Sequence, residues 1–410
     1  MSGADIAWVS VATALVMLMT PALGFFYAGL VRKKNLVSTL AQCMAVFAVV
    51  SLTWTFWGYS LSFGTSVNGV IGDLSLFGLN GVEPTTVARY SSNIPELLFF
   101  AFELMFAAIT PALIIGAFAE RIKFSSLLVF TVLWSTLIYS PIAHWVWNTG
   151  GWLHSLGAID FAGGVVVHVA AGLSALAAAL VVGRRKDFEK RSEFKPSNVP
   201  YVLLGAALLW FGWFGFNGGS ALAANELAVS AIVTTTLSAA AALISWMIVD
   251  WVMKGKPSAT GMAIGSVCGM VAITPASGFV AVPAAIIIGL VAGVISNLVS
   301  NWRVVRTRLD DALDVFACHG VGGIWGSIAT GLFASKQINS INGKDGLFYG
   351  NPNLLVSQLI AVVVVGAFAF FGTYALLRLI KLFSPLRVSP EEEERGLDES
   401  QHGEKAYSED

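Results

Sequence analysis

Long apolar runs separated by short polar stretches dominate this chain. Eleven runs are close to the ~20 residues that a helix needs to cross a bilayer. They lie at about 5–30, 36–62, 95–118, 125–145, 158–183, 199–217, 227–252, 258–275, 279–300, 313–334 and 354–381. The pattern predicts an all-α membrane protein with eleven transmembrane helices.

Basic residues between the runs predict the orientation. If the N-terminus is outside and the loops alternate, 21 of the 24 Lys and Arg residues are inside. Only Arg89, Lys336 and Lys344 are then outside. Because cytoplasmic loops of membrane proteins are enriched in Lys and Arg, we expect the N-terminus outside and the C-terminus inside.

The polar parts of the chain are few. Two loops, at 63–94 and 335–353, are rich in Gly, Asn, Ser and Pro, as connecting loops are. We therefore expect a transmembrane domain at 1–383 and a cytoplasmic regulatory tail at 384–410. The tail contains EEEE at 391–394, and alone its composition is typical of a disordered segment.

The composition agrees with a polytopic membrane protein and not with a nucleic-acid-binding one. Hydrophobic residues make up 56% of the 410 residues and charged residues only 12%, about half the share in soluble domains. No basic cluster is dense enough to follow a phosphate backbone. The three cysteines, Cys43, Cys268 and Cys318, lie in apolar runs, which predicts buried thiols and no disulfide.

A spacing of polar residues occurs twice within apolar runs. Both copies fit Asp-x7-His-x3-Gly, and they read Asp160-FAGGVVV-His168-VAA-Gly172 and Asp311-ALDVFAC-His319-GVG-Gly323. Eight helical residues rise about 12 Å, nearly half of a ~30 Å hydrocarbon core. With each aspartate near a membrane surface, each histidine is predicted near the midplane, where an ionisable group is expensive and indicates a functional site.

The two copies open the fifth and the tenth predicted helices. Five helices per half is an odd number, so the second half is inverted relative to the first. We therefore expect an inverted repeat of helices 1–5 and 6–10 plus a final helix, with the site where the halves meet.

The histidine pair admits several interpretations. One alternative is a purely structural role, in which each histidine is buried and bonded to a backbone carbonyl. Ligation of a haem by both histidines is another. A zinc site needs a third central ligand, and none is evident among His144, His154 and His402. We favour a pair lining a pore, because imidazole both donates and accepts and two adjacent rings share one proton.

The aspartates have simpler interpretations. Asp160 opens a helix and is followed by Gly163 and Gly164, so a helix cap is favoured over a direct ligand, with some attraction for an arriving cation. Asp311 and Asp314 are the inner counterpart, where capping and ion pairing with nearby arginines suffice.

Aromatic residues gather at the predicted outer helix ends. The relevant ones are Phe102 and Phe106 on the third helix, Trp147 beyond the fourth, and Trp213, Phe216 and Ser220 in WFGFNGGS near the end of the sixth. Singly, each is more readily explained by packing. Together, aromatic faces and a hydroxyl form a mouth that attracts a small cation by ~0.5–2 kcal/mol.

The sequence resembles the ammonium transporter family (Amt/Mep/Rh) across nearly its whole length. The stretches that carry the resemblance are GFFYAGLVRKKN (24–35), FAAITPALIIGAFAERIKF (106–124), YSPIAHWVW (139–147), DFAGGVVVHVAAG (160–172), WFGFNGGSALAANE (213–226), AITPASG (272–278), DALDVFACHGVGG (311–323) and GLDESQHGEKAY (396–407).

The resemblance implies a role for each residue. Trp147, Ser220 and Phe106 would form an outer site for NH4+, with Phe106 and Phe216 as the gate beneath it. His168 and His319 would be twin pore histidines, and Asp160 a structural and electrostatic residue. The outer Trp and Ser indicate the Amt branch.

The resemblance also implies a transporter or channel and not an enzyme, with no cofactor and no metal. It would take up ammonium or methylammonium across the cytoplasmic membrane as a homotrimer in the lipid bilayer. A PII-type signal protein would dock on its cytoplasmic face. An ammonium sensor is the rival function, although the tail is too short for an output domain.

Overall fold

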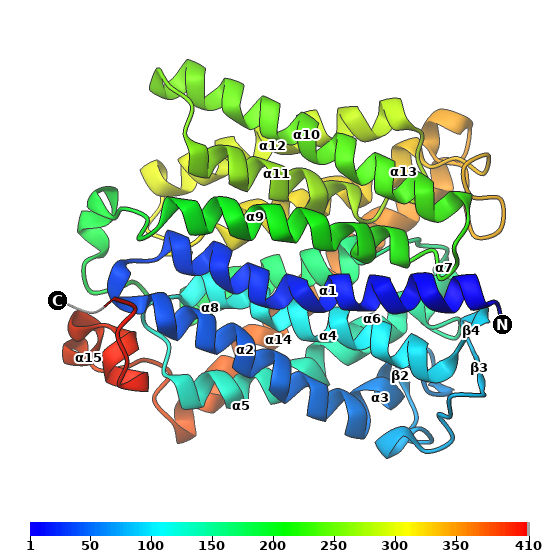
Figure 1. Ribbon diagram of the computed structural model, residues 1–410, viewed down its shortest axis with the longest axis horizontal. Helices are drawn as coiled ribbons and strands as arrows, with labels where there is room; N and C mark the ends of the chain where they lie inside the picture. The colour runs from blue at the N-terminus through cyan, green and yellow to red at the C-terminus, as the bar shows by residue number, and fades with distance from the viewer. Residues whose placement is uncertain (408–410) are drawn as a thin grey trace.

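The protein is a bundle of helices that run roughly along one direction, with the two chain ends at opposite ends of the bundle (Figure 1). The computed structural model describes residues 1–407, apart from the side chains of residues 191–193. We call the end that holds the N-terminus the N-terminal face, and the end that holds the tail the C-terminal face.

Twelve helices of eight or more residues build the described part of the bundle. They are α1 (Gly3–Leu30), α2 (Leu36–Thr53), α4 (Glu96–Phe118), α5 (Phe124–Trp134), α6 (Ser140–Trp147), α8 (Ala170–Val182), α9 (Val199–Trp213), α10 (Glu226–Lys254), α11 (Ala259–Ile273), α12 (Val282–Arg306), α13 (Gly322–Phe333) and α14 (Pro352–Phe383).

Short wider turns with π-helical bonding extend several of these helices. They are η2 (Trp54–Gly58), which leads into α3 (Tyr59–Phe63), η4 (Ser135–Tyr139) between α5 and α6, η5 (Gly164–Val169) before α8, η7 (Phe214–Gly218) after α9, η8 (Phe316–Val321) before α13, and η10 (Asp398–His402) in the tail. Such turns recur at functional sites because they re-aim side chains.

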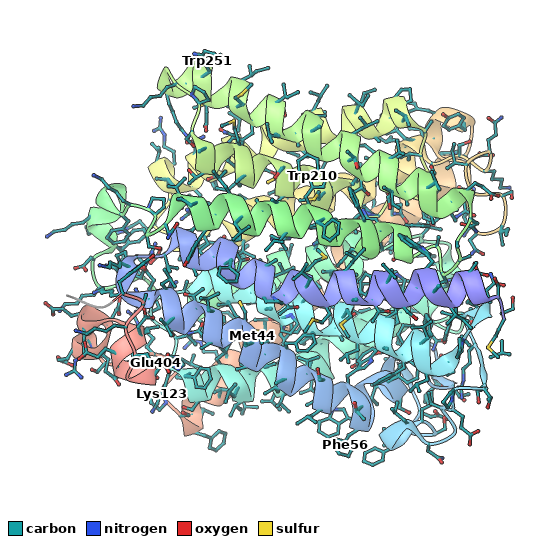
Figure 2. All side chains as sticks on the ribbon, viewed as in Figure 1. Met44, Phe56, Lys123, Trp210, Trp251 and Glu404 are labelled. Carbon is teal, nitrogen blue, oxygen red and sulfur yellow. The ribbon has the colours of Figure 1, made fainter. Side chains whose placement is uncertain are left out.

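Helices occupy all eleven predicted runs. By length and composition, nine helical segments within residues 1–407 can cross a membrane, and each coincides with a predicted run. The two runs outside these nine are 258–275 and 313–334, which form α11 and η8–α13. Side chains on the flanks of the bundle are apolar, with Trp251 56% and Met44 51% exposed (Figure 2). These findings support a multi-pass membrane protein.

The two predicted loops lie at the N-terminal face. Residues 63–94 contain two small antiparallel hairpins, β1 (Ser66–Val67) with β2 (Ile71–Gly72) and β3 (Val87–Ala88) with β4 (Ser91–Pro95), and the turn η3 (Phe77–Leu79). The second loop carries η9 (Leu347–Tyr349), and α7 (Trp152–Leu156) lies between α6 and η5. Two remaining turns are η1 (Lys33–Asn35) and η6 (Phe188–Glu193).

The tail is ordered where it is described, so the expectation of disorder from its composition is wrong for residues 384–407. The EEEE segment forms α15 (Pro390–Arg395), which begins with a capping box between Ser389 and Glu392. The Asp398 carboxylate accepts the backbone N–H of Ser38 at 2.7 Å and so caps α2. Leu386 and Leu397 are buried. Burial of these two leucines and the cap offset the acidic composition; the last three residues of the predicted tail lie outside the described residues.

The two segments that carry the repeated motif cross each other inside the bundle. α8 packs on η8, and α13 packs on η5. A Cβ atom on Gly172 would overlap the backbone of Gly320, and one on Gly323 would lie 3.0 Å from the carbonyl oxygen of Gly164. The start of one segment therefore lies against the far part of the other, so the two are antiparallel and in close backbone contact.

Candidate functional site

A row of four aromatic side chains leads from the N-terminal face into the bundle. Trp147, at the end of α6, lies edge-on to Phe106 of α4 with ring centroids 5.9 Å apart. Phe106 and Phe216 of η7 lie in contact at 4.3 Å. Phe102, one turn before Phe106, lies 5.0 Å from it. Both Phe106 and Phe216 are almost fully buried, so the two rings fill the space between Trp147 and the interior of the bundle.

The histidine pair lies directly beyond this aromatic row. The His168 ring stacks against Phe216 at 6.0 Å, and its Nδ1 lies 3.3 Å from Nδ1 of His319. Both histidines are buried, at 1% and 4% exposure. A bond between two Nδ1 atoms needs a proton on one and a lone pair on the other, so the pair holds one shared proton between its rings. His168 Nε2 has no hydrogen-bond partner within the described residues.

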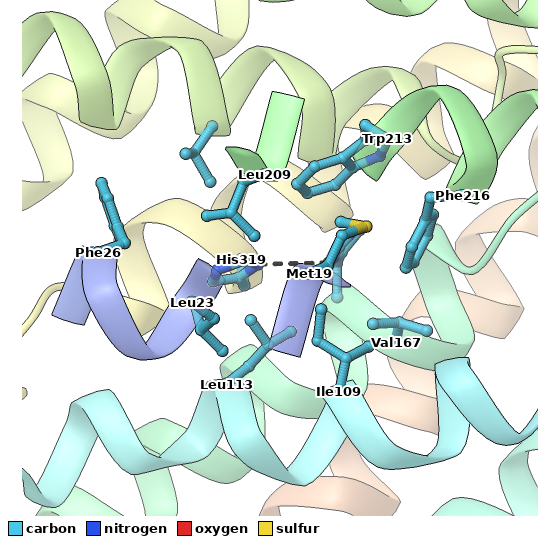
Figure 3. Close-up of a pocket in the computed structure, with 12 residues that line it drawn as sticks. Met19, Leu23, Phe26, Ile109, Leu113, Val167, Leu209, Trp213, Phe216 and His319 are labelled. Atoms are coloured by element: carbon cyan, nitrogen blue, oxygen red, sulfur yellow. Dashed lines mark hydrogen bonds between the residues drawn. The ribbon is translucent and has the colours of Figure 1, made fainter. Parts of the chain in front are cut away.

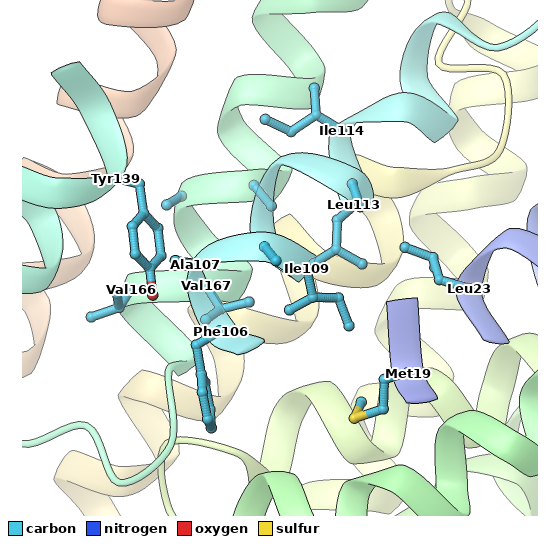
Figure 4. Close-up of a cluster of buried hydrophobic side chains, with 14 of the residues drawn as sticks. Met19, Leu23, Phe106, Ala107, Ile109, Leu113, Ile114, Tyr139, Val166 and Val167 are labelled. Atoms are coloured by element: carbon cyan, nitrogen blue, oxygen red, sulfur yellow. The ribbon is translucent and has the colours of Figure 1, made fainter. Parts of the chain in front are cut away.

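The pair borders a small cavity enclosed by apolar side chains (Figure 3). Its volume is about 10 Å³, close to what one water-sized molecule needs. The lining consists of Met19, Leu23, Phe26, Ile109, Leu113, Val167, His168, Leu209, Trp213, Phe216, Val267 and His319. Around the cavity lies a larger cluster of buried hydrophobic side chains, which includes Phe106, Ile109 and Leu113 of α4 (Figure 4). A porphyrin does not fit in a space of this size, which argues against the haem interpretation.

Asp160 fixes the start of η5. Its carboxylate accepts four backbone N–H groups, from residues 163–166, at 2.6–3.1 Å. Gly163 adopts a left-handed conformation with φ +109°, which a residue with a side chain would adopt only with strain. The Asp160 carbonyl accepts the indole N–H of Trp147 at 2.9 Å. One residue therefore holds both the helix that carries His168 and the tryptophan at the mouth.

Asp311 occupies the matching position before η8. Its carboxylate accepts the N–H groups of Val315 at 3.1 Å and Phe316 at 2.8 Å. Asp314 pairs instead with Arg303 at 2.7 Å and has a left-handed backbone, φ +57°. Both aspartates therefore stabilise the start of η8, Asp311 by capping it and Asp314 by its ion pair with Arg303.

Ser220 lies one turn beyond Phe216. Its hydroxyl donates to the Phe216 carbonyl at 2.8 Å, which leaves its own lone pairs available as acceptors. The described contacts connect Ser220 with η7 and do not join it to Trp147.

Part of the cavity wall was not predicted from the sequence. Trp213, which the sequence placed with the aromatic residues of the outer mouth, lies instead in the cavity wall. It stacks on His168 with centroids 5.6 Å apart, and its N–H donates to Thr274 Oγ1 at 2.9 Å. Met19, Leu23 and Phe26 of α1 carry no signal in the sequence, because they do not differ from other apolar residues of their run.

Buried ion pairs tie together the C-terminal face beyond the histidines. Arg185 bonds Asp310 at 2.8 Å and Glu120 at 2.9 Å, and Arg32 bonds Glu120 at 2.9 Å. Burial would raise the pKa of Asp310, but the positive charges of Arg121 and Arg185 more than offset this and lower it to about 2. The pKa of Glu120 is likewise lowered by Arg185 and Arg32 against the effect of burial. Both carboxylates therefore stay ionised.

The described residues contain no group of three or more His, Cys, Asp or Glu side chains arranged to hold a metal ion. The candidate site thus consists of a row of aromatic side chains, two of them with their rings in contact, and an apolar cavity beside two hydrogen-bonded imidazoles.

Known proteins with the same sequence pattern identify the family. The model of the Ammonium Transporter Family matches residues 7–407. The ammonium transporter Amt1 of Archaeoglobus fulgidus is 49% identical over 408 residues, covering 100% of both chains, and the ammonium transporter of Bacillus subtilis is 47% identical over 96% of both.

Solved structures agree with this. Mep2 of Candida albicans superimposes with a TM-score of 0.89 at 37% identity, over 95% of this chain and 86% of that one. A sensor Amt protein gives 0.90 at 31% identity, over 97% and 98%. The protein is therefore a membrane transporter or channel and not an enzyme, and the chain belongs to the ammonium transporter family.

Proposed function

We propose that this protein takes up ammonium across the cytoplasmic membrane as a source of nitrogen for the cell, and that it conducts the ammonium as NH3. Trp147, Ser220 and Phe106 recruit NH4+ at the N-terminal face. The ion loses its proton there, and NH3 passes between Phe106 and Phe216. His168 and His319 relay the proton.

The single observation that carries the proposal is the cavity of about 10 Å³ directly behind the two phenylalanine rings. A hydrated cation that enters a space of this size sheds its water. The apolar lining offers little in return, so the charge is costly there. A neutral molecule of the size of water pays no such charge penalty. The geometry therefore favours NH3 over NH4+, K+ or Na+ beyond the gate.

The mouth supports recruitment of a cation. Trp147 presents an aromatic face next to Phe106, and Ser220 keeps free acceptor lone pairs. A small cation gains ~0.5–2 kcal/mol from each aromatic face. Asp160, held 7% exposed beneath Trp147, adds a negative charge without coordinating the ion.

The histidine pair supports the relay. Because one Nδ1 donates to the other, when a proton arrives at one ring the shared proton passes to the next ring, which then releases one, so the two rings are never both positively charged. Transport by this route moves net charge.

The proposal includes the topology of eleven crossings, with the N-terminal face outside and the halves inverted. The antiparallel crossing of η5–α8 and η8–α13 supports the inversion, because the two copies of the motif start from opposite faces. The concentration of Lys and Arg in alternate loops supports the orientation.

We extend the proposal to assembly and regulation. Residues 1–383 form the transporter domain of a homotrimer with one pore per subunit, and the tail at 384–410 is regulatory. The tail caps α2 through Asp398 and bonds Lys34 and Lys186 through α15, so a PII-type protein that moves it acts on the first helices.

Charge movement on solid-supported membranes tests the function. We expect ammonium to evoke a transient current in proteoliposomes that contain the protein, and methylammonium to be taken up by a transport-deficient strain that expresses it. Uptake without charge movement would refute the relay. Tight ammonium binding with no uptake would instead favour a sensor, which the likeness to the sensor Amt structure makes the second candidate.

A further inference from the structure

Two cysteine thiols meet in the wall of the bundle beside the histidine pair. Sγ of Cys268, on α11, lies 3.3 Å from Sγ of Cys318, on η8. Both are free thiols, with exposures of 0% and 7%. The chain has only one other cysteine, Cys43 on α2, which is also buried and free.

These thiols lie one layer behind the cavity. Cys318 immediately precedes His319, and Cys268 immediately follows Val267; His319 and Val267 both line the cavity. The thiol pair therefore joins two elements that each contribute a side chain to the passage. Neither recruitment of the cation nor the relay of the proton uses these sulfur atoms.

We propose that Cys268 and Cys318 form a binding site for a soft, two-coordinate metal ion of the Hg²⁺ class. Thiolate sulfur is the protein ligand that soft metal ions prefer. Mercuric chloride, a neutral molecule, reacts with both thiols, forms two S–Hg bonds, and releases two protons and two chloride ions. No oxidant or reductant is needed.

Charge favours this class over a monovalent soft ion. A bis-thiolate complex of Hg²⁺ is neutral, whereas the same complex of Ag⁺ carries a negative charge. Isolated charge is expensive in an apolar interior, so the neutral complex suits these surroundings best. Hard ions such as Mg²⁺ prefer oxygen ligands and do not compete.

Binding has a consequence for His319. A metal ion placed between two sulfur atoms needs more room than a direct sulfur contact, so it forces η8 and α11 apart. The chain is closely packed here: η8 contacts α11, and a Cβ atom on Gly322, the first residue of α13 directly after η8, would lie 3.0 Å from Val271 Cγ1 of α11. The displacement falls on the turn that holds His319 against His168. The proposal that the metal binds depends only on the two thiols. The proposal that binding blocks transport rests on the proposed function.

Binding can be tested on the full-length purified protein without any transport assay. We load the protein with mercuric chloride, wash it with a monothiol, and measure retained mercury and alkylatable thiols by intact mass spectrometry. We expect wild type and Cys43→Ser to retain one mercury per chain. Loss of one arm of a two-point attachment lowers the apparent affinity by on the order of 100-fold, so Cys268→Ser and Cys318→Ser release it.

Two results of that experiment would overturn the site: retention of mercury by the Cys268→Ser/Cys318→Ser double variant, or no retention by wild type. Cys268→Ala and Cys318→Ala serve as second variants where a serine disturbs folding.

The block is tested by ammonium-evoked current with and without mercuric chloride. We expect wild type and Cys43→Ser to lose current and to recover it with a dithiol, and the double variant to keep its current. Equal inhibition of wild type and the double variant would refute the block. A wild-type protein with no current at all would refute the transport proposal, while the mass measurement still decides the metal site.

Discussion

Gly172 of α8 lies with its Cα directly against the backbone of Gly320 in η8, at the point where the two motif-bearing segments cross. The contact is so close that no side chain fits between them. Because Gly320 follows His319, this approach fixes the depth at which His319 meets His168. Gly172, which ends the first copy of the motif, and Gly320, which follows His319, therefore set the distance between the two histidines.

A methyl group at this crossing should separate the two segments. We expect Gly172→Ala to lower the free energy of unfolding by about 1–3 kcal/mol, the usual cost of overpacking a core. It should also abolish most of the ammonium-evoked current, because His319 moves away from its partner. Thermal unfolding in detergent and current on supported membranes measure the two effects.

Gly366 provides a matched control on α14. A Cβ atom there would lie 3.5 Å from Leu173 Cγ, an ordinary contact, so Gly366→Ala should leave the current unchanged. In a helix interior this substitution is neutral or stabilises by up to about 1 kcal/mol. Equal loss of current in Gly172→Ala and Gly366→Ala would mean that the close contact between Gly172 and Gly320 is not specifically required for transport.

Removing both imidazoles should stop the relay of protons. We expect His168→Ala/His319→Ala to reduce ammonium-evoked charge movement by on the order of 100-fold, the range of acid–base contributions in enzymes. The cavity becomes larger and no less apolar, so folding should persist with a modest loss of stability. Size-exclusion profiles and thermal unfolding verify this before the current is compared.

His154 serves as the control for the histidine pair, because it is exposed at the N-terminal face. His154→Ala should transport as wild type does. If the double variant instead keeps wild-type current and selectivity, the relay is wrong and the pair is structural.

Hydrophobic patterning alone predicted the positions of the helices, because long apolar runs have few alternatives in a membrane. The repeated spacing also predicted that His168 and His319 would share one site, although it gave no contact between them. The sequence predicted aromatic residues at the outer helix ends, but it did not predict which of their rings are in contact. Phe106 and Phe216 meet at 4.3 Å from elements over a hundred residues apart, and only the fold brings them together.

Other features left no usable signal in the sequence. The π-helical turns that hold His168, Phe216 and His319 depend on local hydrogen-bond shifts, which hydrophobic periodicity does not encode. The prediction of disorder in the tail was wrong for a different reason. Its charge suggests disorder, yet Asp398 caps a helix more than three hundred residues away, a long-range contact that composition cannot reveal.

The mouth should control apparent affinity more than maximal rate. We expect Trp147→Leu to raise the half-saturating ammonium concentration by about 2- to 30-fold, which corresponds to the loss of ~0.5–2 kcal/mol of cation–π attraction. Ser220→Ala should raise it by a similar factor, about 2- to 12-fold, through loss of one acceptor. The concentration dependence of the current measures both.

Two further variants separate attraction of the cation from packing. Trp147→Phe keeps an aromatic face but cannot donate to the Asp160 carbonyl, so it should fall between wild type and Trp147→Leu. Trp251→Leu changes an outward-facing tryptophan that is 56% exposed and should have no effect. An unchanged half-saturating concentration in Trp147→Leu would remove this residue from the recruitment site.

Asp310 should make the stability of the C-terminal face depend on pH. Breaking its buried pair with Arg185 costs about 3–5 kcal/mol, so Asp310→Asn should unfold more easily at neutral pH. The pKa of Asp310 is lowered from 3.8 to about 2, so the ionised carboxylate stabilises the fold fully above pH 3.8 and loses this effect as the pH falls toward 2. The difference between wild type and variant should therefore be constant above pH 3.8 and shrink below it.

The exposed ion pair between Asp187 and Arg32 at the same face is a control, because it tests whether an ion pair must be buried to stabilise the fold. Asp187 bonds Arg32 at 3.3 Å but is 45% exposed, so Asp187→Asn should change stability by less than about 1 kcal/mol. Unfolding temperatures measured from pH 7 to pH 3 in one detergent give both comparisons. A gap between wild type and Asp310→Asn that widened on acidification would mean that the carboxylate is stabilised in its protonated form, which is opposite to what the arginines around it require.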